Sequence, residues 1–389
     1  MKSIVSNFAF FAGLSGHFGV ARGLRLAGFT LGSCLLVACG ESKAPAKAGA
    51  ENAATSSVAV EAAPIDGTAA SDVPQALVPQ RADPQIHRTE DGHYYFIATA
   101  PNFDRIQLRS ASSLQGIATA EEVTVWEKRE SGPMSENIWA PEIHRFNNTW
   151  YIYFAAGEKG VGGSIRMYVL ANESADPMQG EWKELGLVKT ARDSFSLDAT
   201  VFEHKGQRYL VWAQRDPEGT MNSALYLATL DSPTQVGELE VEITRPTLDW
   251  EIQGYKVNEG AAVIIRNGKI FISYSASATD HRYAVGLIWA DVDANLLDKN
   301  SWQKSPTPIF FTNEKLKRFG PGHNSFTLAD DGKTDVLVYH ARDYMDLQGS
   351  PLSDPNRHTY IRPLEWTAEG FPDFGQDKPD APLPTNSEP

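Results

Sequence analysis

Four ionisable side chains open matching segments of a repeated sequence pattern. They are Asp83, Asp198, Glu259 and His323, and after each one the chain runs into a hydrophobic strand. The aligned segments are Asp83-Pro84-Gln85-Ile86, Ala140-Pro141-Glu142-Ile143, Asp198-Ala199-Thr200-Val201, Glu259-Gly260-Ala261-Ala262 and His323-Asn324-Ser325-Phe326. Neighbouring carboxylates raise each other's pKa and burial penalises their charged form, so three acids brought together indicate a functional site.

Three carboxylates and a histidine could support two kinds of chemistry. A hard cation such as Ca²⁺ takes roughly six to eight oxygen ligands. A glycosidic bond is cleaved by one carboxylic acid that protonates the leaving oxygen and one carboxylate that activates water or attacks the sugar. If the segments form a ring in chain order, Asp198 neighbours Glu259 and can raise its pKa, whereas one unit separates Asp83 from Glu259. Carboxylates with different proton affinities favour acid–base chemistry, since a calcium site does not require such a difference.

Five tight turns define the elements that position these residues. The turns are Asp91-Gly92, Asn147-Asn148, Lys205-Gly206, Asn267-Gly268 and Asp331-Gly332, at spacings of 56, 58, 62 and 64 residues. Such turns favour hairpins, and the strands after them are apolar without alternation, which indicates burial on both faces. Five units of about 60 residues predict an all-β, five-bladed β-propeller. A pair of β-sandwiches is the alternative, but it would have no reason to repeat five times.

The first 39 residues are predicted to be an export signal. Lys2, Arg22 and Arg25 precede a mostly apolar run, residues 26–38, that ends at Cys39 and resembles a bacterial lipoprotein signal. This run is too short to cross a hydrocarbon core about 30 Å thick. We therefore expect lipidation at Cys39 and anchoring in the bacterial envelope, on the periplasmic or cell-surface face of the outer membrane. An ordinary cleavable signal with a chance cysteine is the alternative.

Composition limits the rest of the chain. The 49 acidic and 35 basic residues give a net charge of −14, which argues against a nucleic-acid partner. The two cysteines both lie within the first 39 residues, so a disulfide framework or cysteine-rich zinc site is excluded beyond them. Residues 40–80 have no aromatic side chain and are predicted to be a disordered tether. The propeller is expected over 81–377, with a disordered tail at 378–389, in a protein that works as a monomer.

Four motifs, in order along the chain, carry a family resemblance. They are Ala82-Asp83-Pro84, Trp139-Ala140-Pro141-Glu142, Ser196-Leu197-Asp198 and Asn258-Glu259-Gly260. Over residues 81–377 the chain resembles glycoside hydrolase family 43. The resemblance implies an inverting mechanism with Asp83 as general base, Glu259 as general acid and Asp198 as the carboxylate that modulates the pKa of the acid and orients it. The family commonly has Glu-Gly-Pro at the acid, and here residue 261 is Ala.

The same resemblance bears on ions and substrates. His323 matches an axial histidine that in many members faces a central ion, often calcium, through water; no cofactor is required. Residues 267–280, 296–306, 339–343 and 366–375 are similar to α-L-arabinofuranosidase-type members. This implies an exo-acting enzyme that releases arabinose from plant-type polysaccharide side chains or oligosaccharides. A β-xylosidase acting on xylose-containing glycans, or a non-catalytic glycan-binding lipoprotein, is the alternative.

Several side chains near the acids are candidates for contact with a sugar. Trp139 could stack on a sugar ring or pack between blades, and Phe103 could form part of the pocket wall. Arg342 follows the fifth aromatic strand, where it could reach a sugar hydroxyl, tune a carboxylate or form a surface salt bridge. Glu142 is expected to be a structural hydrogen-bond partner. Surface or packing roles are expected for His340 and His358, because no metal-ligand spacing joins these two histidines.

Overall fold

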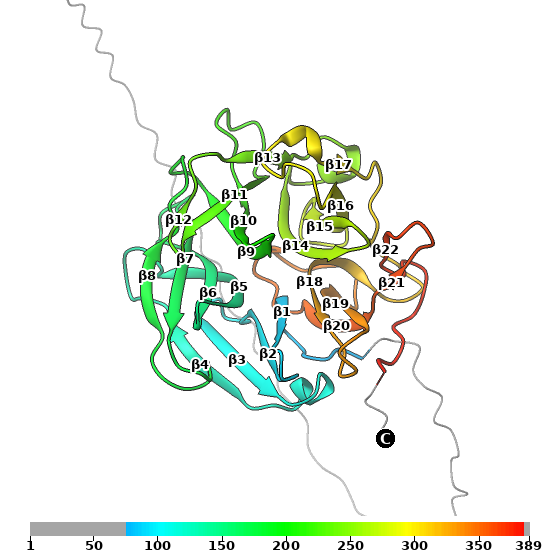
Figure 1. Ribbon diagram of the computed structural model, residues 1–389, viewed down its shortest axis with the longest axis horizontal. Coiled ribbons are helices and arrows are strands. Elements are labelled where there is room, and N and C mark those ends of the chain that lie inside the picture. Colours follow the sequence, from blue (N-terminus) through cyan, green and yellow to red (C-terminus); the bar gives the residue numbers. More distant parts are fainter. Residues whose placement is uncertain (1–74, 385–389) are drawn as a thin grey trace, which may run out of the picture. The chain divides into compact units, whose positions relative to one another are not determined.

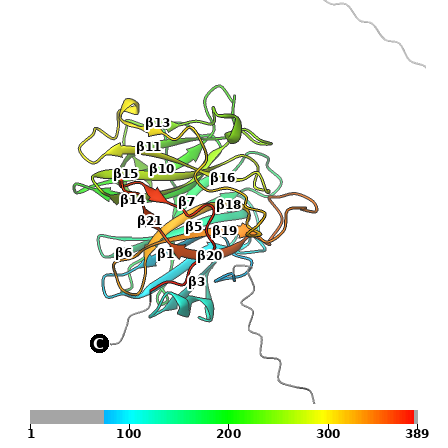
Figure 2. The same ribbon diagram turned by 90° about the vertical axis from the view of Figure 1, so that its right-hand side faces the viewer.

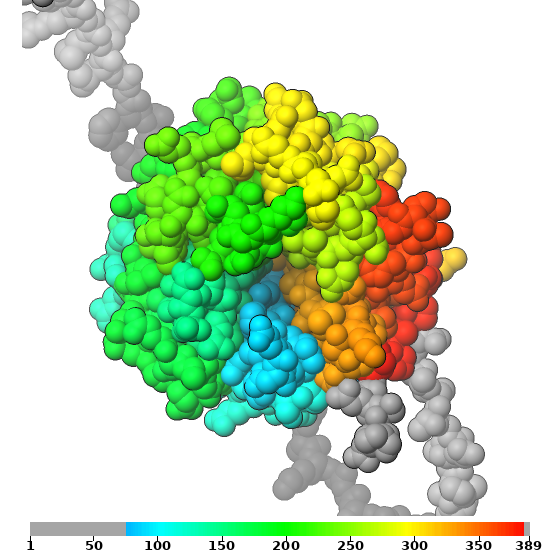
Figure 3. All heavy atoms as spheres, in the orientation of Figure 1, coloured from blue at the N-terminus to red at the C-terminus, as the bar shows by residue number. Residues whose placement is uncertain are grey.

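The computed structural model describes residues 75–384, so the predicted signal, Cys39 and most of the predicted tether lie outside the described residues. Five small antiparallel sheets surround one axis, which confirms the predicted five-bladed propeller (Figure 1). Within residues 75–384, no helix is both long and apolar enough to cross a membrane. Figure 3 shows that the face on view is hollowed at its centre, where the innermost strands meet.

The blades follow one another in chain order. Blade 1 contains β1 (Ala82–Arg88), β2 (Tyr94–Thr99), β3 (Arg105–Ala111) and β4 (Glu122–Glu127), and blade 2 contains β5 (Glu136–Phe146), β6 (Thr149–Gly157), β7 (Arg166–Asn172) and β8 (Lys183–Leu187). Blade 3 contains β9 (Ser196–His204), β10 (Gln207–Gln214), β11 (Ala224–Ser232), β12 (Gln235–Val236) and β13 (Val241–Thr244). Blade 4 contains β14 (Asn258–Arg266), β15 (Lys269–Ala276), β16 (Ala284–Asp291) and β17 (Gln303–Lys304), and blade 5 contains β18 (Phe319–Leu328), β19 (Asp335–Arg342) and β20 (His358–Pro363).

Short elements lie outside the blades. A small hairpin of β21 (Glu365–Trp366) and β22 (Pro372–Asp373) follows blade 5. Three 3₁₀ turns are η1 (Gln115–Ala118), η2 (Asp249–Glu251) and η3 (Lys299–Ser301). The loop between β19 and β20 projects from one edge of the side view (Figure 2).

The predicted turns join the first two strands of every blade. In three of them both central residues have positive φ, as at Asn147 (51°) and Asn148 (59°). This is the conformation that a two-residue type I′ hairpin requires and that Asn and Gly tolerate. The sequence therefore located all five hairpins correctly.

The second strand of each blade is buried on both faces, as its lack of alternation predicted. Tyr94 and Phe96 of β2 pack with Val338 of blade 5. The alternate residues of β2, Tyr95 and Ile97, pack with blade 2. Five hydrophobic clusters result, one at each boundary between neighbouring blades. Each blade is thus stabilised mainly by the blades beside it.

The ring closes through the N-terminal edge of the described chain. Leu77 and Val78 are buried beside blade 5. The backbone N–H of Leu77 donates to the carbonyl of Thr359 at 2.8 Å, and the N–H of Thr359 donates to the carbonyl of Val78 at 3.0 Å. The fold therefore begins before residue 81, where the sequence had placed its start.

The C-terminal segment also packs further along the chain than predicted. Asp380 lies in the segment that was predicted to be a disordered tail. Its carboxylate accepts a hydrogen bond from the hydroxyl of Tyr339 at 2.8 Å and forms an ion pair with Arg362 at 3.2 Å. Arg362 also donates to the carbonyl of Lys378 at 3.1 Å. The end of the propeller domain is therefore at or beyond residue 380.

Asp380→Ala should lower the free energy of unfolding by about 3 kcal/mol, because the buried Arg362 guanidinium loses its charge partner. Urea unfolding measures this change. Glu369→Ala removes an exposed carboxylate from the same end of the chain and should alter stability by less than about 0.5 kcal/mol. Equal effects of the two substitutions would show that the C-terminal segment does not stabilise blade 5.

Candidate active site

An extra residue interrupts every innermost strand at the same point. In each blade two residues of the first strand face one residue of the second, which is a β-bulge. The first residue of each bulge has a left-handed backbone, with φ between 40° and 57°. These five residues are Asp83, Ala140, Asp198, Gly260 and His323. The bulge turns their side chains and backbone N–H groups toward neighbouring blades instead of along the ladder.

The bulges correct the sequence alignment in blade 4. The residue equivalent to Asp83 is Gly260, and Glu259 comes one position earlier. Trp139 and Leu197 occupy the position of Glu259 in blades 2 and 3. Because successive side chains of a strand point to opposite sides, Glu259 belongs to a different layer of the site from Asp83.

Asp83 is held by three hydrogen bonds. Its Oδ2 accepts a hydrogen bond from the hydroxyl of Thr99 at 2.6 Å, and its Oδ1 accepts one from Nη1 of Arg357 at 2.9 Å. The backbone N–H of Ala140 donates to the same Thr99 oxygen at 2.7 Å, so the hydroxyl proton must point to Asp83. The backbone N–H of Asp83 donates to Nδ1 of His340 at 3.0 Å. The carboxylate therefore has one fixed orientation.

The three acids have different proton affinities. Burial alone would raise the pKa of Asp83, but the Arg357 cation and other nearby groups outweigh it and hold that pKa well below its usual value. Burial raises the pKa of Glu259 to about 7, against the hydrogen bond that Glu259 accepts from the Tyr283 hydroxyl at 2.9 Å. Burial, together with the charge of Glu259, also raises the pKa of Asp198 well above its usual value. Near neutral pH the site thus combines an ionised Asp83 with a proton-bearing Glu259.

Asp198 connects blades 3 and 4. Its Oδ2 accepts the backbone N–H of Gly260 at 2.9 Å, directly after Glu259. A Cβ at residue 260 would lie 2.9 Å from Cγ of His323, so glycine is needed there as well as for the positive φ. Asp198 therefore fixes the backbone that carries Glu259, which is the orienting part of its predicted role.

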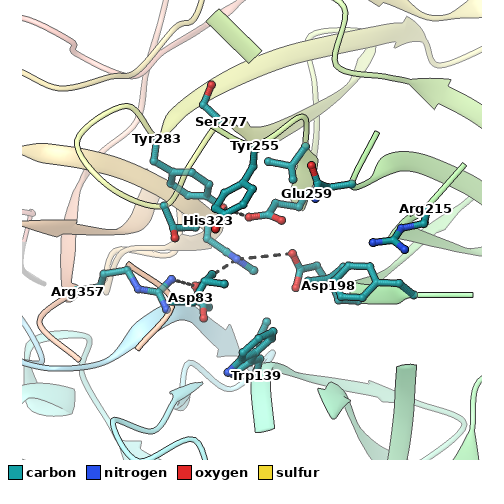
Figure 4. A pocket seen from close by; sticks show the side chains of 17 residues that line it. Asp83, Trp139, Asp198, Arg215, Tyr255, Glu259, Ser277, Tyr283, His323 and Arg357 are labelled. Atoms are coloured by element: carbon teal, nitrogen blue, oxygen red, sulfur yellow. Dashed lines mark hydrogen bonds and ion pairs between the residues drawn. The ribbon is translucent and has the colours of Figure 1, made fainter. Parts of the chain in front are cut away.

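His323 faces the acids. Its Nδ1 lies 3.3 Å from Oδ1 of Asp83 and 4.0 Å from Oδ2 of Asp198, and its backbone N–H donates to Oγ of Ser275 at 2.7 Å. Burial lowers the pKa of His323. The histidine thus lies between the two aspartates, as Figure 4 shows.

The side chains around His323 offer few ligands for an ion on the axis. In the part of the chain that the structure describes, no group of three or more His, Cys, Asp or Glu side chains is arranged to hold a metal. The neighbouring amide of Asn324 is buried, and neither of its polar atoms has a partner in that part. Calcium requires roughly six to eight oxygen ligands, so these residues do not form a cage of protein ligands. An ion on the axis would therefore have to contact His323 through water.

The acids open into a single cavity of about 250 Å³. Its lining includes Asp83, Trp139, Asp198, Tyr255, Glu259, Tyr283, His323, Leu352 and Arg357. Figure 4 shows Glu259 and the two tyrosines on one side, with Asp83 and Arg357 on another and Trp139 beneath. The cavity is at the small end of ligand pockets and has an apolar wall, which suits one small ring-shaped ligand.

Two predicted sugar contacts, Arg342 and Phe103, are not among the residues that line the cavity, and neither is Glu142, for which a structural role was expected. Arg342 is buried, and its guanidinium donates to Asp354 at 2.6 Å and to the carbonyl of Thr279 at 2.6 Å. Phe103 lies in the turn after β2, where its carbonyl accepts the N–H of Ile138 at 3.0 Å. The carboxylate of Glu142 pairs with His144 at 3.0 Å, which is the structural role expected for it. Of the predicted sugar contacts, the structure brings only Trp139 to the cavity.

Sequence reasoning missed Thr99, Tyr283 and Arg357 and gave His340 a packing role. Thr99, Ser275 and His340 share one position near the ends of their strands, opposite the residue before the bulge. Thr99 and Ser275 lie seven residues after the turn glycines Gly92 and Gly268, and His340 lies eight after Gly332. This nearly constant distance is a signal that could have identified them. Arg357 comes from a long loop and Tyr283 precedes β16, where no repeat marks either residue.

Comparison with known proteins agrees with this geometry. The model of the family described as glycosyl hydrolases family 43 matches residues 76–372. An α-L-arabinofuranosidase from Lactobacillus brevis, known from its crystal structure, is 47% identical with a TM-score of 0.75, and the match covers 82% of this chain and 99% of that one.

Two relatives from Streptomyces are similarly close in sequence. An extracellular exo-α-(1→5)-L-arabinofuranosidase of Streptomyces avermitilis is 52% identical over 299 residues, which are 77% of this chain and 62% of that protein. The protein of the same description from Streptomyces chartreusis is 51% identical over 275 residues, 71% of this chain and 84% of that protein. The match thus spans about three fifths of the first relative's length.

Glu259→Gln should stabilise the protein at high pH. Since the pKa of Glu259 is raised from an ordinary value of about 4.3 to about 7, the proton favours the folded state. That stabilisation is complete below about pH 4 and is lost as the pH rises through 7, whereas glutamine is neutral throughout. The melting temperature of Glu259→Gln relative to the parent should therefore be higher at pH 8 than at pH 4.5. The exposed Glu369→Gln is the control, and a pH-independent difference for Glu259→Gln would contradict the raised pKa.

Proposed function

The chain belongs to glycosyl hydrolase family 43, and from this premise we propose that it is an inverting, exo-acting α-L-arabinofuranosidase. The observation that carries the proposal is the pair of carboxylates with opposite pKa shifts, Asp83 and Glu259, in one cavity. Glycoside hydrolysis needs one carboxylate that accepts a proton and one carboxylic acid that donates one. The names of the relatives support the choice of sugar.

In the proposed mechanism the two carboxylates act in one displacement. Asp83 takes a proton from a water molecule as the water oxygen bonds to the anomeric carbon. The bond from that carbon to the leaving oxygen breaks, and Glu259 gives its proton to the leaving oxygen. Arg357 keeps Asp83 ionised before the reaction, and Asp198 holds the backbone next to Glu259. The released sugar carries the hydroxyl group from water, and the leaving group carries the proton from Glu259. Asp83 ends protonated and Glu259 ends ionised.

The cavity supports removal of one terminal sugar. Its volume of about 250 Å³ favours a pocket that admits a single ring over a long groove. Trp139 offers an apolar face on which that ring can stack. We propose arabinose-containing oligosaccharides and polysaccharide side chains as substrates. No described contact favours the β-xylosidase or the non-catalytic binder over this enzyme.

The proposal extends to the protein's location. The relatives from Streptomyces are described as extracellular, which supports export of this chain. The signal-like run before Cys39 supports lipid anchoring in the envelope, with the propeller as a monomer outside the bilayer. Mass spectrometry of the mature protein would test lipidation at Cys39 directly. His323 remains a proposed water-mediated contact to an axial calcium ion.

Glu259→Gln should lower kcat on an arabino-oligosaccharide by about 10²- to 10⁴-fold, because the poor leaving group loses its proton donor. Initial rates with the oligosaccharide and with a nitrophenyl arabinofuranoside measure the effect, which should be smaller for the activated nitrophenyl group. Glu142→Gln is the matched control, since Glu142 is buried but does not line the cavity. Equal oligosaccharide rates for the parent and Glu259→Gln would rule out Glu259 as the acid.

The first product released should have the opposite anomeric configuration to the substrate. Proton NMR during the first minutes of hydrolysis distinguishes the two anomers before they interconvert. Inversion is expected because Asp83 is ionised and hydrogen bonded as a base that activates water. A retained configuration would require a covalent sugar intermediate and would contradict the mechanism.

Initial rates with nitrophenyl xyloside and nitrophenyl galactoside, compared with the rate on nitrophenyl arabinofuranoside, show which sugar the enzyme releases.

A further inference from the structure

Two buried aromatic rings join the two carboxylates of the site. The Tyr283 hydroxyl donates to Oε1 of Glu259 at 2.9 Å. The Tyr283 ring stacks on the His340 ring with an angle of 7° and a centroid distance of 5.8 Å. Nδ1 of His340 accepts the backbone N–H of Asp83 at 3.0 Å. A continuous set of contacts therefore runs from Glu259 to Asp83 through the stack.

The hydrogen bond to Asp83 determines the state of His340. Because Nδ1 accepts a hydrogen bond from the backbone N–H of Asp83, the ring's own proton must be on Nε2. Nε2 is buried and has no hydrogen-bond partner among residues 75–384. The 3.3 Å contact between Nδ1 and Oδ1 of Asp83 is then not an ion pair, since the histidine is neutral. An apolar ring would pack here without leaving a donor unpaired, so packing alone does not explain the histidine.

The absence of a side chain at Gly322 leaves the space that the Tyr283 ring occupies. A Cβ there would lie 2.4 Å from two carbon atoms of the Tyr283 ring. Gly322 pairs with His340 across β18 and β19, so the space it leaves lies directly beside the stack. Tyr283 and His340 are almost fully buried, which leaves their rings little freedom to move.

The surroundings of Glu259 are otherwise charged. Asp83 of blade 1 and Arg357 of the loop before β20 act on its carboxyl group, and the charge of Glu259 acts in turn on Asp198 of blade 3. The tyrosine hydroxyl is the hydrogen-bond donor that the described structure gives to the Glu259 side chain. Without it, the carboxyl group could rotate within the cavity.

We propose that Tyr283 and His340 form one positioning unit: the tyrosine orients Glu259, the histidine fixes the backbone of Asp83, and their stack sets the two carboxylates relative to each other. This inference rests on the proposed function, in which Glu259 is the acid and Asp83 the base. Neither aromatic residue exchanges a proton with the substrate. Their effect is on kcat, through the placement of the groups that do.

Tyr283→Phe keeps the ring and removes the hydroxyl. Its kcat on the arabino-oligosaccharide should fall by about 10-fold or more, while kcat on nitrophenyl arabinofuranoside changes by less than about threefold and KM stays similar. Tyr226→Phe is the matched control, because the buried Tyr226 also donates to a carboxylate, Glu242, and stacks on Trp212. Tyr226→Phe should leave the ratio of the two rates unchanged.

His340→Phe keeps a stacked ring and removes the acceptor for Asp83. Its kcat should fall by about 10²-fold on both substrates, because the base is needed whatever the leaving group. His340→Asn places an oxygen near the position of Nδ1 and should restore most of that loss. Thermal unfolding checks each variant, and if His340→Phe does not fold, the result for Tyr283→Phe decides.

The outcomes separate this inference from the proposed function. If the parent cleaves neither arabinofuranoside, the proposed function fails, and this inference with it. If the parent is active and Glu259→Gln is impaired, but Tyr283→Phe behaves like Tyr226→Phe, only the positioning unit is overturned. A His340→Phe variant that folds and keeps kcat within about threefold of the parent would overturn it too. A leaving-group-dependent loss in Tyr283→Phe supports it.

Discussion

The β-bulge at the head of every innermost strand is the constraint on which the site depends. A bulge frees one backbone N–H from the ladder, and in four blades a side chain of the preceding blade accepts it. The acceptors are His340 for Asp83, Thr99 for Ala140, Asp198 for Gly260 and Ser275 for His323. The same bonds that tie neighbouring blades together therefore also place the site. Because the ring is closed by Thr359 pairing with the N-terminal edge, Asp83 and His340 meet although they are far apart in sequence.

Left-handed backbone conformation carries a cost that the ring must offset. Four of the five bulge residues are not glycine, and such residues at positive φ cost about 1–3 kcal/mol each. The five hydrophobic clusters between blades supply the stability that allows this. In return, the side chains of Asp83 and Asp198 converge at one end of the axis. The one-residue offset of Glu259 then separates acid from base within the same cavity.

Sequence predicted the architecture well because turns and buried strands are local signals. Asn and Gly tolerate positive φ, so the residue types of Asn147-Asn148 and Asn267-Gly268 already indicate a tight turn. The repeat length of about 60 residues then gives the number of blades. The one-residue offset of Glu259 could not be predicted this way. Glu259 or Gly260 could equally be aligned with Asp83 in the sequence, and only the pairing register of β14 with β15 shows that Gly260 is the equivalent residue. Arg357 was missed for a related reason. Arg357 lies in the loop between β19 and β20, and the buried Arg342 holds that loop through its hydrogen bond to Asp354. Arg342, which the sequence predicted as a sugar contact, therefore positions the loop from which Arg357 reaches Asp83.

Ala261 stands where the family commonly has the proline of Glu-Gly-Pro. Residue 261 is the second residue of its bulge, and the equivalent positions hold Pro84, Pro141, Ala199 and Asn324. Since three residue types, Pro, Ala and Asn, occupy that place in one ring, proline is not what makes it rigid. The restriction lies at Gly260, where the positive φ, the close His323 ring and the hydrogen bond to Asp198 leave one conformation. Alanine at residue 261 therefore does not loosen Glu259, because the residue before it is already fixed from the neighbouring blades.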